Sequence, residues 1–168
     1  MGSQGIRIGP SNELSAYSKD EQYFVQEFID GREFTIDVLC GANYLPSLII
    51  PRERLEVKAG VATKVRITND PNLIELGKRI VEKYPLIGFS NIQFMMKDDR
   101  YYFIELNPRF GGMSIASVLA SYNYVDEYIS ALIEGRTLSA DLETNMKRVK
   151  WGAIVTRYYE EKIFLDRR

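Results

Sequence analysis

Two strands separated by a short polar turn would bring an amide, a carboxylate and a second amide together. Apolar and polar residues alternate over 92–97 and over 101–107, which is typical of strands with one buried face. The side chains in these segments that could do chemistry are Gln93, Glu105 and Asn107. Carboxylate and amide oxygens suit Mg²⁺, which keeps waters and phosphate oxygens in the rest of its shell. The three residues are therefore a candidate metal site.

The register of the expected hairpin decides whether these side chains meet. If Lys97 pairs with Tyr101 across the three polar residues between them, Gln93 pairs with Glu105. Directly opposed Cβ atoms lie about 4.5–5.5 Å apart, and Asn107, two residues on, shares the face of Glu105. The other face is expected to be core and carries Ile92, Phe94, Met96, Ile104 and Leu106. An ordinary hairpin with a solvated polar face is the alternative that this pattern leaves open.

Basic side chains supply candidate ligands for an anion. Pro108 ends the second strand because it has no N–H to donate, and Arg109 then lies beside the candidate metal site. An arginine there is suited to a phosphate or a carboxylate. A second group of cations consists of Arg52, Arg54, Lys58, Lys64 and Arg66. Within it we expect a catalytic role for Lys64, whereas Arg54 and Lys58 are expected to be solvated and balanced by nearby glutamates.

Composition excludes several classes of protein. The 168 residues are enough for one domain with a core, and 45% hydrophobic with 27% charged residues is typical of a globular protein. The net charge of −1 does not favour nucleic-acid binding. The sequence contains no histidine, which excludes His ligands and His-dependent catalysis, and its one cysteine, Cys40, excludes an internal disulfide. No apolar run is long enough for a membrane span and no signal peptide is visible, so we expect a cytoplasmic location.

The remaining pattern predicts an α+β fold, with an antiparallel β-sheet and helices packed on one face. Besides the central hairpin, strands are expected over 6–8, 23–29, 33–40, 44–50, 61–67 and 147–164, with residues 30–32 as a hairpin turn. Residues 51–60 are expected to be irregular. Helices are expected over 10–19, from Pro71 to Tyr84 after the Asp70 cap, over 115–121, and over 125–134 up to Gly135.

Taken together, these segments resemble the ATP-grasp superfamily of ligases over roughly residues 1–135. Residues 25–34 are similar to the family's adenine-hinge strand and the turn after it. Gln93 with the run Glu105-Leu106-Asn107-Pro108-Arg109 is similar to its metal-binding hairpin, and residues 2–5 are similar to its glycine loop. Gln at position 93 and the Asn-Pro-Arg run are closest to carbamoyl-phosphate-synthase-like proteins. The run Phe110-Gly111-Gly112-Met113-Ser114 differs from the Arg- and Ser-rich run of those proteins, so the substrate stays open.

The resemblance implies a role for each matching residue. The glycine loop (Gly2, Ser3, Gln4 and Gly5) would cover phosphates; the alternative is an unstructured terminus. Backbone groups of Glu27 and Ile29 would meet adenine, Phe28 would pack the hinge, and Glu33 would accept hydrogen bonds from ribose. Gln93, Glu105 and Asn107 would hold Mg²⁺, with Mn²⁺ as a substitute. Arg109 would stabilise the charge that develops during transfer.

The implied reaction is that of an ATP-dependent carbon–nitrogen ligase. A carboxylate attacks the γ-phosphate of ATP, and an amine or ammonia displaces phosphate from the acyl-phosphate. The expected partners are ATP, these small molecules and a second copy of the chain, without nucleic acid or membrane. The family's preceding subdomain, with its phosphate-binding lysine strand, is expected upstream of Met1. The chain would then be part of a longer enzyme. By itself it is expected to be inactive, with weak or undetectable ATP binding.

The expected organisation is one truncated domain over 1–168. Residues 1–24 would be the remnant of the preceding subdomain, 25–135 the ATP-grasp core and 136–168 a C-terminal strand extension. Two alternatives stay open. One is a non-catalytic nucleotide-binding or subunit-interaction module on an ATP-grasp-like scaffold. The other is a structural α+β domain without a nucleotide.

Overall fold

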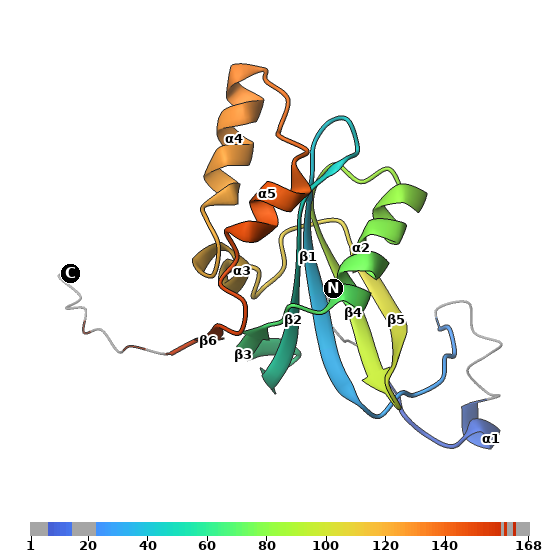
Figure 1. Ribbon diagram of the computed structural model, residues 1–168. Helices are drawn as coiled ribbons and strands as arrows, with labels where there is room; N and C mark the ends of the chain where they lie inside the picture. The colour runs from blue at the N-terminus through green and yellow to red at the C-terminus, as the bar shows by residue number, and fades with distance from the viewer. Residues whose placement is uncertain (1–6, 15–22, 159, 161–162, 164–168) are drawn as a thin grey trace, which may run out of the picture.

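An antiparallel sheet forms the centre of the protein (Figure 1). The computed structural model describes residues 7–14, 23–158, 160 and 163. Within these residues the sheet has six strands in the order β5-β4-β1-β2-β3-β6. The strands are β1 (Arg32–Cys40), β2 (Pro46–Lys58), β3 (Val61–Ile67), β4 (Gly88–Lys97), β5 (Arg100–Asn107) and β6 (Ile154–Thr156). The helices are α1 (Ser11–Leu14), α2 (Pro71–Lys83), α3 (Ile115–Leu119), α4 (Tyr124–Glu134) and α5 (Leu142–Lys147).

Both faces of the central strand β1 are covered. Every residue of β1 from Phe34 to Cys40 is buried, whereas a strand with one solvated face would alternate. Ile36 packs in a cluster with Leu73 of α2, while Leu39, on the opposite face of β1, packs in a cluster with Ala116 of α3. The α+β class and the antiparallel sheet expected from the sequence are confirmed. The helices, however, lie against both faces rather than one, with α2 on one side and α3 on the other.

The central hairpin forms as expected, but with a different turn. Lys97 pairs with Arg100, so the turn holds two residues, Asp98 and Asp99, with φ angles of 49° and 56°. This register alone would place Gln93 opposite Ile104. The ladder shifts by one residue between Gln93 and Phe94, and Gln93 therefore pairs with Glu105. The expected three-residue turn is wrong, and the expected pairing is right because a β-bulge restores it.

The hairpin expected around residues 30–32 is absent, since residues 23–30 form no strand. Strand β1 pairs with β2 on one side and with β4 on the other, so it offers no free edge to an N-terminal partner. Arg7 and Ile8 likewise form no strand. Of the helix expected over 10–19, residues 10–14 lie within the described part of the chain, and Ser11–Leu14 form α1.

Further differences concern β2 and the C-terminal part of the chain. Residues 51–58, expected to be irregular, continue β2 through Lys58, because they pair with β1 and β3. Of the strand expected over 147–164, the described residues contain only β6, and the helix α5 precedes it. The two long helices agree with the sequence. Asp70 Oδ1 accepts hydrogen bonds from the first turn of α2, and Gly135, with φ 66°, ends α4.

Candidate functional site

The three candidate metal ligands meet on one face of the β4–β5 hairpin. Gln93 and Glu105 are directly opposed, and Asn91 is opposite Asn107. Asn107 Nδ2 donates to Glu105 Oε1 over 2.7 Å. Glu105 is exposed, while Gln93 and Asn107 are half-buried. The sequence-based expectation that these side chains converge is confirmed. We call this side of the sheet, which also carries Thr35 and Asp37 of β1, the site face.

Arg109 lies beside the three ligands, as expected. Its Nη2 is 3.5 Å from Asn107 Oδ1, and its Nη1 donates to the carbonyl oxygen of Phe110 over 3.3 Å. The side chain is exposed, so the guanidinium can turn toward an anion at the site. Pro108 ends the strand as its missing N–H predicts, and β5 stops at Asn107.

Arg54 also belongs to the site face, although the sequence favoured a solvated role for it. Its guanidinium forms an ion pair with Glu33 and donates to the carbonyl oxygen of Gly60 over 2.9 Å. The Arg54 side chain is only 8% exposed. Burial lowers the pKa of Arg54, and the charges of Glu33 and Glu105 partly offset that shift. Arg54 is thus a buried cation within electrostatic reach of the candidate metal carboxylate.

Lys64, by contrast, is not brought to the metal ligands. It alternates along β3 with Val65, which is buried in the cluster on the site face with Ala116. The Lys64 side chain therefore projects from the other face. Its Nζ lies 3.2 Å from Glu56 Oε1, and the Lys64 and Glu56 side chains are 38% and 60% exposed. A catalytic role for Lys64 stays a prediction that this arrangement does not favour.

A buried polar cluster adjoins the site, and sequence reasoning missed it. Its centre is Asp37, whose carboxylate pairs with Arg52 through Nε at 2.8 Å. Asn91, Ser114 and Ser117 also donate to this carboxylate. Burial alone would raise the pKa of Asp37, but Arg52 and the two serines outweigh it and hold that pKa below its ordinary value. The signal in the sequence was an aspartate in the middle of the apolar run 34–40.

The ligand set suits a cation that arrives with a nucleotide. Within the described ranges, no three His, Cys, Asp or Glu side chains gather where they could hold a metal ion. The candidate site accordingly offers one carboxylate, Glu105, and two amides. Mg²⁺ needs about six oxygen ligands, so phosphate oxygens and waters would supply the rest. The donor chemistry therefore fits Mg²⁺ bound to phosphates better than bare Mg²⁺.

Comparison with known families agrees with this geometry. Residues 19–154 match the family model described as "ATP-grasp in the biosynthetic pathway with Ter operon". The chain belongs to this ATP-grasp family. The match includes β1 to β5, the candidate metal ligands, Arg54 and the Asp37 cluster. The superfamily expected from the hairpin residues is therefore confirmed.

Curated relatives of this ATP-grasp chain include longer ligases and synthases. It is 26% identical over 125 residues to the carbamoyl phosphate synthase large chain of Agathobacter rectalis, covering 65% of this chain and 12% of the relative. It is 29% identical over 93 residues to tyramine–L-glutamate ligase of Methanocaldococcus jannaschii, covering 54% of this chain and 30% of the relative. The chain thus spans well under half the length of either relative.

A solved structure supports the ATP-grasp fold independently of sequence. N5-carboxyaminoimidazole synthetase from Staphylococcus aureus, complexed with ADP, matches with a TM-score of 0.56 and 19% identity. The match covers 68% of this chain and 33% of that chain. At this identity, the similarity concerns the fold.

The residues expected to bind the nucleotide in this ATP-grasp chain are only partly described. Gly2, Ser3, Gln4 and Gly5 lie outside the described residues. Glu27 and Phe28 are exposed in an irregular segment, and Ile29 is buried. Their contacts with adenine stay predictions. Glu33 lies on β1, and any contact with a ribose would have to compete with its ion pair to Arg54.

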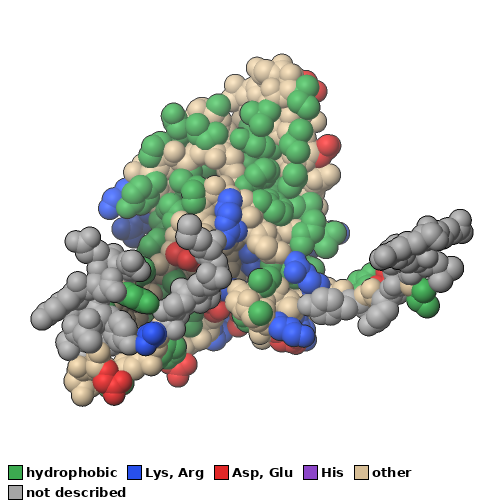
Figure 2. Space-filling view, turned by 180° about the vertical axis from the view of Figure 1, so that it is seen from behind, with side chains coloured by type: hydrophobic (Ala, Val, Ile, Leu, Met, Phe, Trp, Pro, Cys, Tyr) green, Lys and Arg blue, Asp and Glu red, His purple; other side chains and the backbone are tan. Residues whose placement is uncertain are grey.

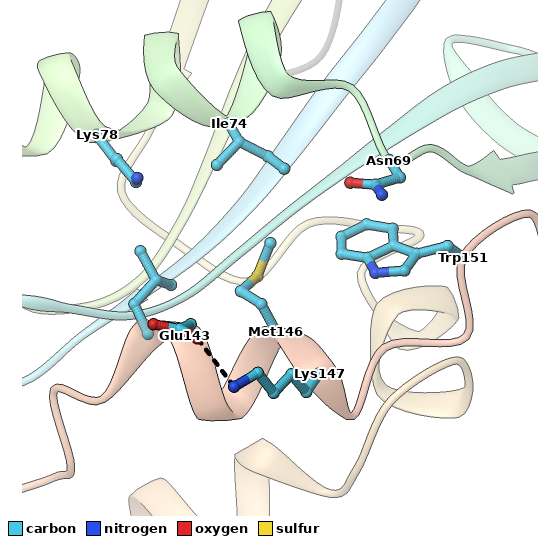
Figure 3. Close-up of a pocket in the computed structure, with 8 residues that line it drawn as sticks. Asn69, Ile74, Lys78, Glu143, Met146, Lys147 and Trp151 are labelled. Carbon is cyan, nitrogen blue, oxygen red and sulfur yellow. Dashed lines mark ion pairs between the residues drawn. The ribbon is translucent and has the colours of Figure 1, made fainter.

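Two further surface features are a hollow that contains none of the candidate metal ligands and an area of apolar surface. A hollow of about 540 Å³ separates α2 from α5, and Figure 3 shows Ile74 and Met146 on its two sides. The ion pair between Lys147 and Glu143 lies at its rim. Figure 2 shows hydrophobic side chains over much of the upper half of the view from behind. None of the helices in the described residues combines the length and apolar character that crossing a bilayer requires.

Proposed function

We propose that this chain supplies the metal-binding part of an ATP-dependent ligase that joins a carboxylate to an amine or to ammonia. The observation that carries the proposal is the direct opposition of Gln93 and Glu105, with Asn107 bonded to Glu105. A carboxylate oxygen of the substrate attacks the γ-phosphorus of ATP, and the bond from that phosphorus to the bridging oxygen of ADP breaks. The amine nitrogen then attacks the acyl carbon, phosphate leaves and the nitrogen loses a proton.

The three ligands have distinct parts in this proposal. Glu105 would bind the metal through its carboxylate, while Gln93 and Asn107 would bind it as neutral amide oxygens. Mg²⁺, or Mn²⁺ in its place, would neutralise charge on the phosphate oxygens. Because two of the three ligands are amides, the site keeps little negative charge of its own. This favours a metal that enters with the nucleotide.

Cations on the same face would stabilise the charge that moves during transfer. Arg109 is exposed next to Asn107 and can contact a phosphate or the substrate carboxylate. Arg54 is buried and already desolvated, and it interacts electrostatically with Glu105. We assign it the cation role on the strands, ahead of the Lys64 that the sequence suggested. Glu33 would release Arg54 when it accepts hydrogen bonds from a ribose.

The proposed nucleotide and substrates rest partly on similarity. ATP-grasp enzymes generally use ATP and Mg²⁺, and the names of the two curated relatives describe a carbamoyl phosphate synthase and a tyramine–glutamate ligase. The second name contains an amine, tyramine, and an acid, glutamate. Binding of adenine at residues 27–29 and of phosphates at residues 2–5 completes the proposal. Cytoplasmic location and self-association stay predictions.

The test uses Mn²⁺-ADP as a paramagnetic probe. Bound Mn²⁺ broadens the NMR signals of nearby nuclei even when binding is weak. In the wild-type chain, Mn²⁺-ADP is expected to broaden the amide NMR signals of residues 92–94 and 104–109 before others. Glu105→Gln keeps the shape but removes the charge, and is expected to abolish this broadening. Glu56→Gln is the control, since Glu56 is a solvated carboxylate paired with Lys64. Broadening that is unchanged in Glu105→Gln would refute the metal assignment.

A second candidate function is a non-catalytic subunit-interaction module on the same scaffold. Apolar side chains on α3 and α4 favour it, since Leu119 is 61% exposed and Ile133 is 82% exposed. In the longer protein expected from the sequence, this function predicts nucleotide binding without turnover when ATP, an acid and an amine are supplied. Sedimentation of the chain over a range of concentrations would reveal association through this surface.

A further inference from the structure

The Asp37 carboxylate accepts hydrogen bonds from four side chains that lie 15 to 80 residues from it in the sequence. Arg52 donates from Nε at 2.8 Å and from Nη2 at 3.4 Å. Asn91 Nδ2 donates at 2.7 Å, and the hydroxyls of Ser114 and Ser117 donate at 2.6 Å each. All five residues are at most 4% exposed. A buried carboxylate this well satisfied is strongly ordered, because losing any donor leaves it partly unpaired.

Two of these donors lie beside residues 107–111, the turn that follows β5 and carries Arg109. Asn91 lies on β4 directly opposite Asn107, so Asp37 holds the neighbour of a metal ligand. Ser114 lies five residues after Arg109, and its hydroxyl also accepts from the Gly111 amide over 2.9 Å. The carboxylate therefore holds the residue of β4 that pairs with the last residue of β5, and it also holds the loop after the turn.

The loop after Arg109 is packed tightly against this cluster. A Cβ on Gly111 would lie 2.7 Å from Ser114 Oγ and 2.8 Å from Asn91 Nδ2. Glycine is therefore required at this position by lack of space. Because the backbone at Gly111 rests on two side chains that Asp37 holds, movement of either would move the turn that carries Arg109.

We propose that Asp37 is a positioning residue, which holds Asn107 and Arg109 in the geometry that binds the metal–nucleotide. The proposal rests on the proposed function. Asp37 lies beneath the turn and acts through Asn91 and Ser114, without contacting the bound molecule. Side chains that orient metal ligands commonly change metal affinity by about 10–100-fold when they are removed.

Ser114→Ala and Ser117→Ala form a matched pair that tests it. Each removes one buried hydroxyl at 2.6 Å from Asp37, but only Ser114 is tied to the loop after Arg109. The readouts are the affinity for Mn²⁺-ADP and the exchange rate of the Arg109 amide hydrogen. That amide bonds to the carbonyl oxygen of Asn107 at 2.8 Å, so it reports the turn without involving either serine.

Both variants are expected to melt at similarly reduced temperatures. Ser114→Ala is expected to weaken Mn²⁺-ADP binding by about tenfold and to speed exchange of the Arg109 amide. Ser117→Ala is expected to leave both nearly unchanged. Asp37→Asn, if it folds, should weaken binding at least as much as Ser114→Ala.

The outcomes separate the two proposals. Equal effects of the two serine variants on binding and exchange, or no effect of either, would overturn the positioning role. Absence of Mn²⁺-ADP binding near residues 93, 105 and 107 in the wild-type chain would instead refute the proposed function. In that case the binding role assigned to Asp37 is refuted with it, whatever the exchange data show.

Discussion

Gln93 and Glu105 face each other across β4 and β5 because the hairpin contains one unmatched residue, Ile104. The two-residue turn would otherwise pair Gln93 with Ile104 and send the Glu105 side chain to the opposite face. A β-bulge near a functional site re-aims a side chain in this way. The candidate metal site therefore depends on the bulge as much as on the identity of its ligands.

The turn of this hairpin offers a test of the backbone geometry. Asp98 and Asp99 both have positive φ, the arrangement for which Asn-Gly is the favoured pair. The double substitution Asp98→Asn with Asp99→Gly is expected to raise the free energy of unfolding by about 0.5–1 kcal/mol. Urea denaturation measures the change. A loss of stability would indicate that the turn has another conformation.

The two candidate cations on β2 and β3 can be distinguished by substitution. Arg54→Ala removes a buried charge near Glu105, whereas Lys64→Ala removes a solvated partner of Glu56. We expect Arg54→Ala to weaken Mn²⁺-ADP binding clearly and Lys64→Ala to have little effect. Titration of both variants followed by NMR measures the difference. A larger loss of Mn²⁺-ADP binding in Lys64→Ala than in Arg54→Ala would instead support Lys64 as the functional cation.

The Asp37 cluster predicts a pH dependence of stability. The pKa of Asp37 is lower in the folded protein than its ordinary value of 3.8. Its stabilising contribution is therefore fully present above that value and is lost as the pH falls through the folded-state pKa. Asp37→Asn is expected to cost about 3 kcal/mol at pH 7. Urea unfolding at decreasing pH should show this difference shrinking below about pH 4, and a constant difference would contradict the ionised state.

The contact between α2 and the sheet predicts an unusual effect of alanine. Gly77 lies inside α2, where alanine normally stabilises a helix by about 1 kcal/mol. Here a Cβ would lie 2.9 Å from Cγ2 of Ile49, a residue with no exposed surface. We expect Gly77→Ala to lower the free energy of unfolding by about 1–2 kcal/mol. Glu75→Ala, at an exposed position of the same helix, is the control and should change stability little.

Local sequence patterns were sufficient to predict several helices and strands. Asp70 before Pro71 predicted the start of α2, and Gly135 predicted the end of α4, because caps are formed by neighbours in sequence. Apolar alternation predicted β4 and β5. Residues 23–29 have the composition of a strand, but β1 has no free edge for them. Whether a strand has a free edge depends on the assembled sheet, so the sequence of residues 23–29 cannot show it.

The sequence by itself identified the residues of the candidate site, namely Gln93, Glu105 and the run from Asn107 to Arg109, because their types and spacing are local. Only the tertiary structure decided which further residues join them. Arg54 and Lys64 have similar surroundings in the sequence, and strand alternation within the sheet separates them onto opposite faces. Asp37 acquires its four partners from β2, β4, the loop after β5 and α3. Contacts between segments up to 80 residues apart depend on how strands pair and helices pack, which local spacing does not encode.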